Sequence, residues 1–335
     1  MSEKLTKKSA IVEIFAKTAM NSKMDSEVEK SDYKDAVKII QELATVPNPM
    51  NRYELNQIVG YTVDNVLDVR LNYLPLVAEV KNTAFDERPK FKVKTQGITA
   101  YWQAIGSTTQ RTKVGAKYSD ITLEALSARP TAEWAEIAAG RYNFEQLIRD
   151  VANEFEAKIA QKIQTTLLAT YVGLTSSNYN TGSGLIAGTF DPILVAMQRF
   201  GKCAIIGDYA ALQKLAALTG FTAVTSTLQF SPNIIDEQNR NGFIGVYKGA
   251  SVVQLDNPYS GLTGFTTVLD PGYVYIVPAV SDEFKTLKIQ FAGPTLAMEG
   301  QNIDDFSYDM RYDKHMGAAI VDARHCMGCY VDSSL

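Results

Sequence analysis

Hydrophobic residues recur every three or four positions between residues 143 and 171. The series begins at Phe144 and Ile148 and ends at Leu167 and Tyr171, with polar and charged residues between its members. This spacing places the apolar side chains on one stripe of a helix with 3.6 residues per turn. The pattern predicts one amphipathic helix of about 40 Å. Such a helix is typical of the core of a large enzyme or of a spine against which other elements pack.

Weaker helical patterns precede this helix. Short helices are predicted over residues 5–20 and 32–44, and a longer one over residues 53–73. The first 50 residues carry mixed charge and a weak apolar face. We interpret residues 1–75 as an N-terminal arm and not as part of a core.

The hydrophobic period changes to two in the stretch 74–128. Residues 90–94 alternate strictly between lysine and an apolar residue, as in a half-exposed strand. Residues 75–80, 98–105 and 118–126 are further strand candidates. We interpret the stretch as a long twisted β-hairpin with little core of its own.

Short elements of both kinds follow, which indicates an α+β fold class. The predicted elements are a helix over 132–139 with Thr131 as its N-cap, a loop over 173–184, a helix from the Asp191-Pro192 pair to Phe200, a strand over 203–206, a helix over 209–218 capped by Asp208, and strands over 243–246, 251–255, 265–269, 273–277, 287–291, 295–299, 306–311 and 318–330.

The hairpin region is basic in an otherwise acidic protein. The chain has a net charge of −4 and a pI near 5.4, yet residues 88–119 contain no Asp or Glu. The basic side chains of the hairpin are Arg88, Lys90, Lys92, Lys94, Arg111, Lys113 and Lys117. A solvated face, a contact with an acidic surface of another subunit, and a nucleic-acid contact all remain open, although the aromatic residues here are not spaced as a stacking platform. We treat these seven residues as candidates for inter-subunit contact.

The residues that carry most enzyme chemistry are scarce. The sequence has two histidines, and it contains no nucleophile elbow, no phosphate-binding loop and no dinucleotide fingerprint. We therefore predict no catalytic residue, no cofactor and no enzymatic activity. Three cysteines do not form a secreted disulfide framework, which indicates a reducing compartment. No stretch is apolar enough for a signal peptide or a transmembrane helix, so we expect no membrane partner.

One cluster near the C-terminus has the residue types of a metal site. His325, Cys326 and Cys329 are the candidates, because Cys-x-x-Cys is half of a zinc site. A structural zinc site needs four ligands, and His315 is the only other histidine. Residues 318–331 also alternate like a strand, which would direct neighbouring side chains to opposite faces. We therefore favour packing and predict no metal.

The order of these parts carries a family resemblance. The relevant segments are Ala84-Phe-Asp-Glu-Arg-Pro-Lys-Phe-Lys-Val-Lys at the entry of the hairpin, Arg141-Tyr-Asn-Phe-Glu-Gln-Leu-Ile-Arg-Asp at the start of the long helix, Ala204-Ile-Ile-Gly-Asp-Tyr-Ala-Ala-Leu-Gln-Lys-Leu, and Tyr247-Lys-Gly-Ala-Ser-Val-Val-Gln-Leu-Asp-Asn. Over residues 50–335 the chain resembles the major capsid proteins of tailed bacteriophages, which have the HK97-like fold.

This resemblance implies a domain organisation. The N-terminal arm would span residues 1–75, and the extended loop 84–128 would lie on the adjacent subunit. The peripheral domain would comprise residues 76–83, 129–185 and 286–317, with the spine helix at 143–171, and the axial domain would comprise residues 186–285 and 318–335.

The resemblance also implies partners. Copies of the chain would form pentamers and hexamers of an icosahedral shell, assembled in the bacterial host cytoplasm and found in the virion. The shell would enclose double-stranded DNA without sequence-specific binding, and scaffolding, portal and decoration proteins are further partners of such shells. Some family members link subunits through a lysine–asparagine isopeptide bond, for which Lys90, Lys92 or Lys113 would be candidates. Others lose an N-terminal scaffolding segment, but we favour an arm for residues 1–50.

Two alternatives differ in function. An encapsulin-type nanocompartment shell shares this fold but houses a cargo enzyme. A mixed α/β enzyme would instead be a discrete monomer or small oligomer with a polar cleft.

Overall fold

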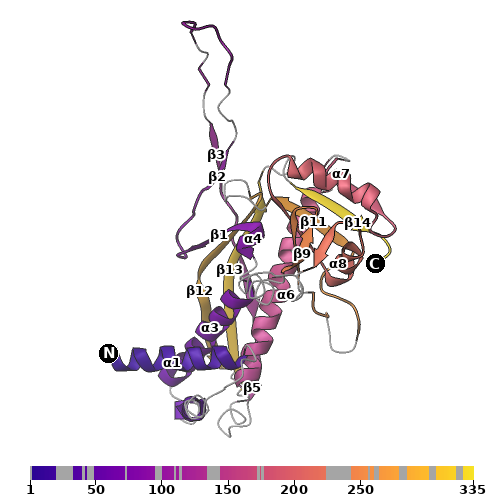
Figure 1. The fold of residues 1–335 in the computed structure, drawn as a ribbon. Helices are drawn as coiled ribbons and strands as arrows, with labels where there is room; N and C mark the ends of the chain where they lie inside the picture. Colours follow the sequence, from indigo (N-terminus) through magenta and orange to yellow (C-terminus); the bar gives the residue numbers. More distant parts are fainter. Residues whose placement is uncertain are drawn as a thin grey trace. The chain divides into compact units, whose positions relative to one another are not determined.

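A computed structural model describes the fold (Figure 1). It covers residues 2–19, 33–39, 42–43, 49–71, 74–94, 100–108, 111–112, 115–133, 144–171, 174, 177–223, 243–255, 257–259, 264–278, 285–301, 307–321 and 327–335. The helices are α1 (Ser2–Ala19), α3 (Pro49–Arg70), α4 (Leu74–Val77), α6 (Phe144–Tyr171), α7 (Ala187–Gln198) and α8 (Tyr209–Ala216). The strands are β1 (Ala78–Thr83), β2 (Phe91–Lys94), β3 (Ala116–Ser119), β4 (Glu124–Ala128), β5 (Thr131–Glu133), β6 (Tyr179–Gly182), β7 (Cys203–Gly207), β8 (Phe221–Ala223), β9 (Phe243–Tyr247), β10 (Ala250–Gln254), β11 (Tyr273–Pro278), β12 (Leu287–Gln301), β13 (Ser307–Ile320) and β14 (Gly328–Asp332).

Residue contacts divide the chain into two compact units. Unit 1 consists of Met1–Asn72, Leu123–Ala160 and Phe291–Met316, and unit 2 consists of Tyr73–Thr122, Gln161–Gln290 and Gly317–Leu335. Helix α6 and strands β12 and β13 contribute residues to both units.

In unit 1, α3 is joined to β12 and β13 by a polar seam. The Asp64 carboxylate accepts hydrogen bonds from the backbone N–H of Thr295 at 2.7 Å and from Lys314 Nζ at 2.6 Å. Asn56 donates to Glu299 at 3.0 Å and accepts from the Tyr312 hydroxyl at 3.3 Å. Buried polar groups are stable only when they are paired, so these bonds fix how α3 lies on the strands. The strands belong to a sheet of order β1-β12-β13-β4, with β5 paired to β13.

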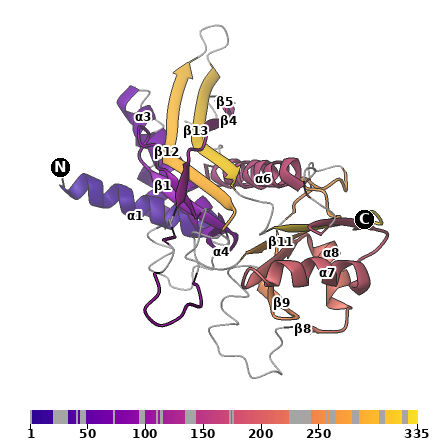
Figure 2. The ribbon, with the colours of Figure 1, turned by 90° about the horizontal axis from the view of Figure 1, so that it is seen from above.

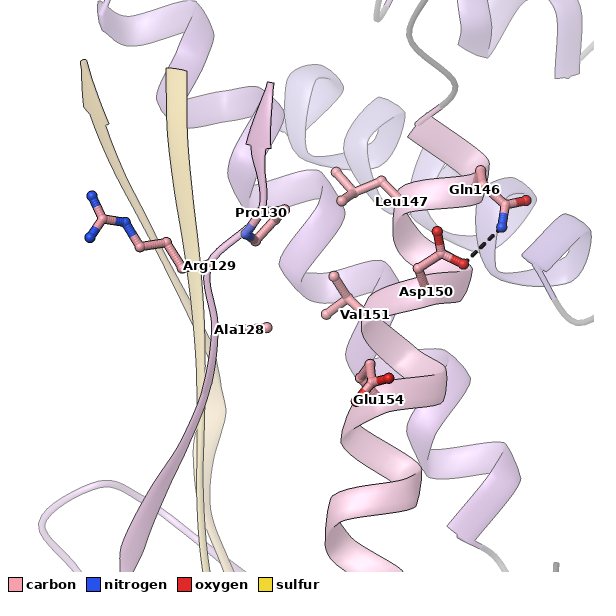
Figure 3. A pocket seen from close by; sticks show the side chains of 8 residues that line it. All are labelled: Ala128, Arg129, Pro130, Gln146, Leu147, Asp150, Val151 and Glu154. Carbon is pink, nitrogen blue, oxygen red and sulfur yellow. Dashed lines mark hydrogen bonds between the residues drawn. The ribbon is translucent and has the colours of Figure 1, made fainter. Parts of the chain in front are cut away.

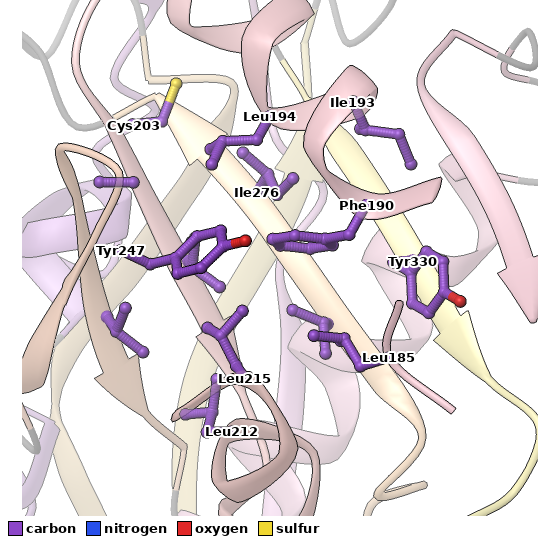
Figure 4. Packing of buried hydrophobic residues seen from close by; sticks show 14 of the residues in the cluster. Leu185, Phe190, Ile193, Leu194, Cys203, Leu212, Leu215, Tyr247, Ile276 and Tyr330 are labelled. Carbon is purple, nitrogen blue, oxygen red and sulfur yellow. The ribbon is translucent and has the colours of Figure 1, made fainter. Parts of the chain in front are cut away.

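Unit 2 contains a sheet of seven described strands in the order β6-β14-β11-β7-β10-β9-β8. Helices α7 and α8 lie on one side of β11 and β14 (Figure 2), and their apolar faces share one core with the sheet (Figure 4). Within it, the Phe190 ring meets the Tyr330 ring edge-on at 5.9 Å. Side chains alternate along β11, so Tyr275 faces the opposite side and stacks on Tyr171 of α6 at 5.7 Å.

The long helix is confirmed over Phe144–Tyr171. Its predicted stripe is buried, including Ile148 and Leu167. The N-cap of α8 is also confirmed, because the Asp208 carboxylate accepts the backbone N–H of Ala210 at 2.7 Å.

Several local predictions are wrong. Residues 74–77 are helical, so the strand begins only at Ala78, and the described part of 98–105 forms no strand. Residues 131–133 form β5, which pairs with β13, so Thr131 is not the N-cap of a helix that starts at residue 132. The rest of the predicted helix, residues 134–139, lies outside the described residues. Helix α7 begins five residues earlier than predicted. The Asp191 carboxylate does not cap it but accepts hydrogen bonds from the Tyr247 hydroxyl at 2.9 Å and Lys248 Nζ at 2.6 Å.

The late strands are longer than predicted. The segments 287–291 and 295–299 belong to one strand, β12. Within it, Gly293 directly before Pro294 takes a φ of 68°, a left-handed conformation that glycine adopts without steric cost. Strands β6 and β8 were not predicted, and residues 265–269 contribute a single bridge at Thr267.

Candidate assembly interface

The hairpin of unit 2 exposes part of its predicted basic set. Strands β2 and β3 pair only with each other in the described chain, with Lys92 opposite Tyr118. Phe91 is buried, whereas the neighbouring Lys90 and Lys92 are exposed, as the alternation of a strand requires. Arg88 and Arg111 are also exposed.

The exposure of the other three basic residues of the set is not described. Lys94 and Lys117 lie on β2 and β3, and their side chains are outside the described part of the structure. Lys113 lies outside the described residues altogether.

The tip of the hairpin is apolar and fully exposed. All described residues from 100 to 108 are exposed, and Trp102 and Ile105 have relative exposures of 105% and 106%. A tight turn shapes the tip, since the Ser107 N–H donates to the Ala104 carbonyl at 3.0 Å. Two large apolar side chains that no described part of the chain covers indicate a binding partner.

Polar side chains of β12 hold the root of the hairpin. Gln290, which is 1% exposed, donates from Nε2 to Thr83 Oγ1 at 3.0 Å and to the Glu87 carbonyl at 3.1 Å. The buried Lys288 ammonium pairs with the Glu79 carboxylate. Because these bonds fix where the chain leaves β1, they also set the direction in which the hairpin starts.

Lys81 extends this network into the hairpin itself. Its ammonium lies 3.3 Å from Glu79, donates to the Lys90 carbonyl at 3.0 Å and sits 4.5 Å from the centre of the Phe91 ring. The first residues of β2 are therefore anchored by charge–carbonyl and cation–π contacts.

Unit 1 contains a groove of about 520 Å³ between α6 and the segment joining β4 to β5 (Figure 3). Its lining residues are Ala128, Arg129, Pro130, Gln146, Leu147, Asp150, Val151 and Glu154.

The groove has an apolar floor and an acidic edge. Leu147 and Val151 are buried, while Asp150 and Glu154 are exposed one turn apart on α6. The Asp150 carboxylate accepts a hydrogen bond from Gln146 at 2.7 Å. Arg129 is paired with Asp309, and its side chain is directed away from α6 (Figure 3). The groove therefore presents negative charge above apolar surface.

The sequence alone does not indicate this groove. The only local pattern that relates to it is the pair of acidic residues at 150 and 154 beside the apolar residues at 147 and 151. Such a pattern on a helix is equally typical of a solvated edge, so the groove became visible only when Pro130 and Ala128 were placed opposite α6.

The Cys-x-x-Cys segment is only partly described, because His325 and Cys326 lie outside the described residues. Cys329 on β14 is buried, and burial raises the pKa of its thiol well above the usual range. Such a thiol is a poor nucleophile at neutral pH. In the described part of the chain, no group of three or more His, Cys, Asp and Glu residues is placed to hold a metal ion. None of the described helices is long and apolar enough to span a membrane.

Two solved structures have a similar fold. The capsid of an empty GTA particle matches with a TM-score of 0.52 at 13% identity, over 79% of this chain and 89% of that chain. The head of the Helicobacter pylori bacteriophage KHP40 matches with a TM-score of 0.52 at 9% identity, over 80% of this chain and 91% of that chain. These similarities confirm the predicted HK97-like capsid fold.

No curated protein sequence matches the chain significantly. A family model does match, and it extends over residues 3–331, nearly the whole chain. The chain therefore belongs to the family described as "SPbeta prophage-derived putative capsid protein YonB", and it is a phage capsid protein.

Proposed function

We propose that the protein is the major capsid protein of a tailed phage, and that its copies form the pentamers and hexamers of an icosahedral shell around double-stranded DNA. In this proposal its role is structural and not catalytic, and the shell assembles in the bacterial host cytoplasm before it becomes part of the virion. The observation that carries the proposal is the exposed hairpin, whose described tip, residues 100–108, is fully exposed and whose Arg88, Lys90 and Arg111 are also exposed.

The adjacent copy offers a complementary surface. Exposed cations at Arg88, Lys90 and Lys92 match the acidic edge at Asp150 and Glu154. We place the hairpin of one copy along the groove of the next copy. Apolar side chains of the hairpin would then contact Leu147 and Val151 on the groove floor. Complementary charge mainly steers register and partner choice, whereas buried apolar area supplies affinity.

Two general properties fit a shell that encloses DNA, namely many modest contacts between its copies and the net negative charge of the chain. Many modest contacts acting together make a closed particle stable. An acidic protein also avoids binding strongly to the DNA that it encloses. The domain boundaries, the arm at residues 1–50 and any scaffolding, portal or decoration partner remain part of this proposal.

Charge reversal of the hairpin tests the contact. We expect Lys90→Glu combined with Lys92→Glu and Lys94→Glu to impair particle formation while the subunit stays folded, measured by electron microscopy and circular dichroism. The matched control replaces the same three lysines by arginine and should assemble normally, because it keeps the charge. Normal particles from the glutamate variant would contradict the contact. The content of the shell can be tested on virions made with the full set of phage genes. We expect these virions to contain double-stranded DNA that is protected from nuclease.

A further inference from the structure

The outer surface of α7 lacks the charged residues that a solvated helix normally has. Asp191 is the only charged residue of α7, and its carboxylate is already bonded to Tyr247 and Lys248. Exposed Pro192 and Val195 lie on the side opposite the core, and Val195 is 49% exposed. Surface helices usually carry polar residues opposite their core face, and a helix that is apolar all round is normally covered.

A second exposed apolar surface lies in the connection between β10 and β11. The rings of Tyr259 and Phe265 meet edge-on at 5.8 Å, and these residues are 60% and 90% exposed. Aromatic side chains in such positions are frequent anchors of protein interfaces.

Hydrogen bonds join the two described parts of this connection, residues 257–259 and 264–269. Asn257 donates from Nδ2 to Asp208 at 2.7 Å and to the Leu269 carbonyl at 3.0 Å, and its Oδ1 accepts the Leu269 N–H at 2.8 Å. The Val268 N–H donates to the Pro258 carbonyl at 2.9 Å. Segments that are already held by hydrogen bonds lose little conformational entropy when they bind, so these bonds favour the two rings as a contact surface.

These two surfaces are attached at opposite ends of β7. The last turn of α7, which contains Val195, leads to Cys203 at the start of the strand, whereas the loop is held by Asp208 just after its end. A strand of this length spans about 17 Å. A surface and its complement on different parts of one molecule form a head-to-tail contact, and such contacts build a ring when the rotation between copies closes.

The charges beside the two surfaces are complementary. Arg199 is exposed just after α7 and on the same side as Pro192 and Val195, and the structure gives it no ion pair among the described residues. Asp270 is exposed five residues after Phe265. A contact that brings these two charges together would favour one register of the ring.

We propose that Tyr259 and Phe265 of one copy cover the Pro192–Val195 surface of α7 in the next copy, with Asp270 facing Arg199. This inference rests on the proposed shell function and identifies a second contact, independent of the hairpin, within a ring of subunits.

Photo-crosslinking tests which surface the loop meets. Benzoylphenylalanine at position 265 replaces an exposed ring and should leave the subunit folded. In assembled particles we expect a covalent dimer, with the crosslinked peptide of the second copy mapping to α7. A crosslink that maps elsewhere, a link only within one chain, or no link in well-formed particles would overturn the proposal while leaving the shell function intact. Failure of the unmodified protein to form particles would instead count against the shell function.

Point variants provide a second test of the proposed contact. We expect Val195→Glu and Phe265→Glu to lower the yield of closed particles by at least about tenfold, the scale of an interface hot spot. The matched control is Gln213→Glu on the exposed side of α8, which should stay within about twofold because it lies outside both surfaces. Circular dichroism confirms that each variant is folded. A folded Val195→Glu or Phe265→Glu variant that assembles like the control would also overturn the proposal.

Discussion

The carboxylate of Asp332 lies 2.8 Å from the ammonium of Lys214, which ties the C-terminal strand to α8. The same carboxylate accepts the backbone N–H groups of Gly184 at 2.7 Å and Ser334 at 2.9 Å. Burial alone would raise the pKa of Asp332, but the hydrogen bonds from Lys214, Ser334 and Gly184 outweigh it and hold this pKa well below its usual range.

This relationship predicts acid sensitivity of unit 2. Because the folded-state pKa of Asp332 is below the unfolded value of about 3.9, its stabilisation is complete above that value and is lost as the pH falls below it. We expect Asp332→Asn to cost about 2 kcal/mol at pH 7, the scale of a hydrogen bond to a charged group. Urea unfolding followed by circular dichroism measures both effects. The gap between wild type and variant should shrink between pH 4 and pH 2, and a gap that stays constant over this range would contradict the assignment.

The pairing of Lys288 with Glu79 predicts an asymmetric response to mutation. Glu79→Gln removes the carboxylate beside an ammonium that is 1% exposed, so we expect a cost of about 3–5 kcal/mol. Lys288→Met should cost less, because Glu79 keeps Lys81 at 3.3 Å and the new side chain is apolar. Unfolding midpoints give the order of stability. Limited proteolysis should also cut the hairpin faster in Glu79→Gln, and equal stability of the two variants would refute the asymmetry.

The core of unit 2 depends on the ring of Phe190. It is fully buried and packs against Tyr330 at 5.9 Å and Tyr247 at 6.0 Å (Figure 4). We expect Phe190→Ala to cost about 3–5 kcal/mol and Phe190→Leu about 1 kcal/mol, because leucine fills more of the space. Denaturant unfolding measures the difference. A small effect of the alanine variant would show that α7 repacks over the sheet more readily than its contacts indicate.

The elements that the sequence predicted well are those in which one local signal dominates. Helix α6 needs only a repeated apolar stripe without a breaker, and Asp208 caps α8 through its own neighbour Ala210. The order of such elements was enough to indicate the HK97-like fold.

The wrong predictions have tertiary causes. Thr131 is a good N-cap residue, yet pairing with β13 draws it into β5. The Asp191-Pro192 pair would start a helix well, but contacts with Tyr247 and Lys248 occupy the carboxylate. The groove depends on segments that are distant along the chain, and no local pattern encodes which surface faces Asp150. Local propensity is overridden where partners from elsewhere satisfy the same groups.

The buried thiols lead to a chemical prediction. Cys203 and Cys329 are buried, and burial raises the pKa of Cys329, so neither should react with a water-soluble disulfide reagent in the native protein. Both should react once the protein is unfolded in urea. Mass spectrometry of the labelled peptides assigns each site, with Cys329→Ala as the control for its peptide. Fast native labelling of Cys329 would indicate that β14 opens readily.

The complementarity of hairpin and groove predicts compensation between copies. Asp150→Lys with Glu154→Lys should block assembly, because the acidic edge would then repel Lys90 and Lys92. Mixing this variant with one that carries Lys90→Glu and Lys92→Glu should restore contacts in which a reversed hairpin meets a reversed groove. Combining all four changes in one chain should restore particles more completely, because every contact is then complementary.

The isosteric control, Asp150→Asn with Glu154→Gln, removes charge without repulsion and should weaken assembly less, with a smaller dependence on salt. Electron microscopy and light scattering at several salt concentrations measure these outcomes. If the fourfold variant is folded but assembles no better than the groove variant alone, the hairpin does not bind this groove, whatever other surface it contacts.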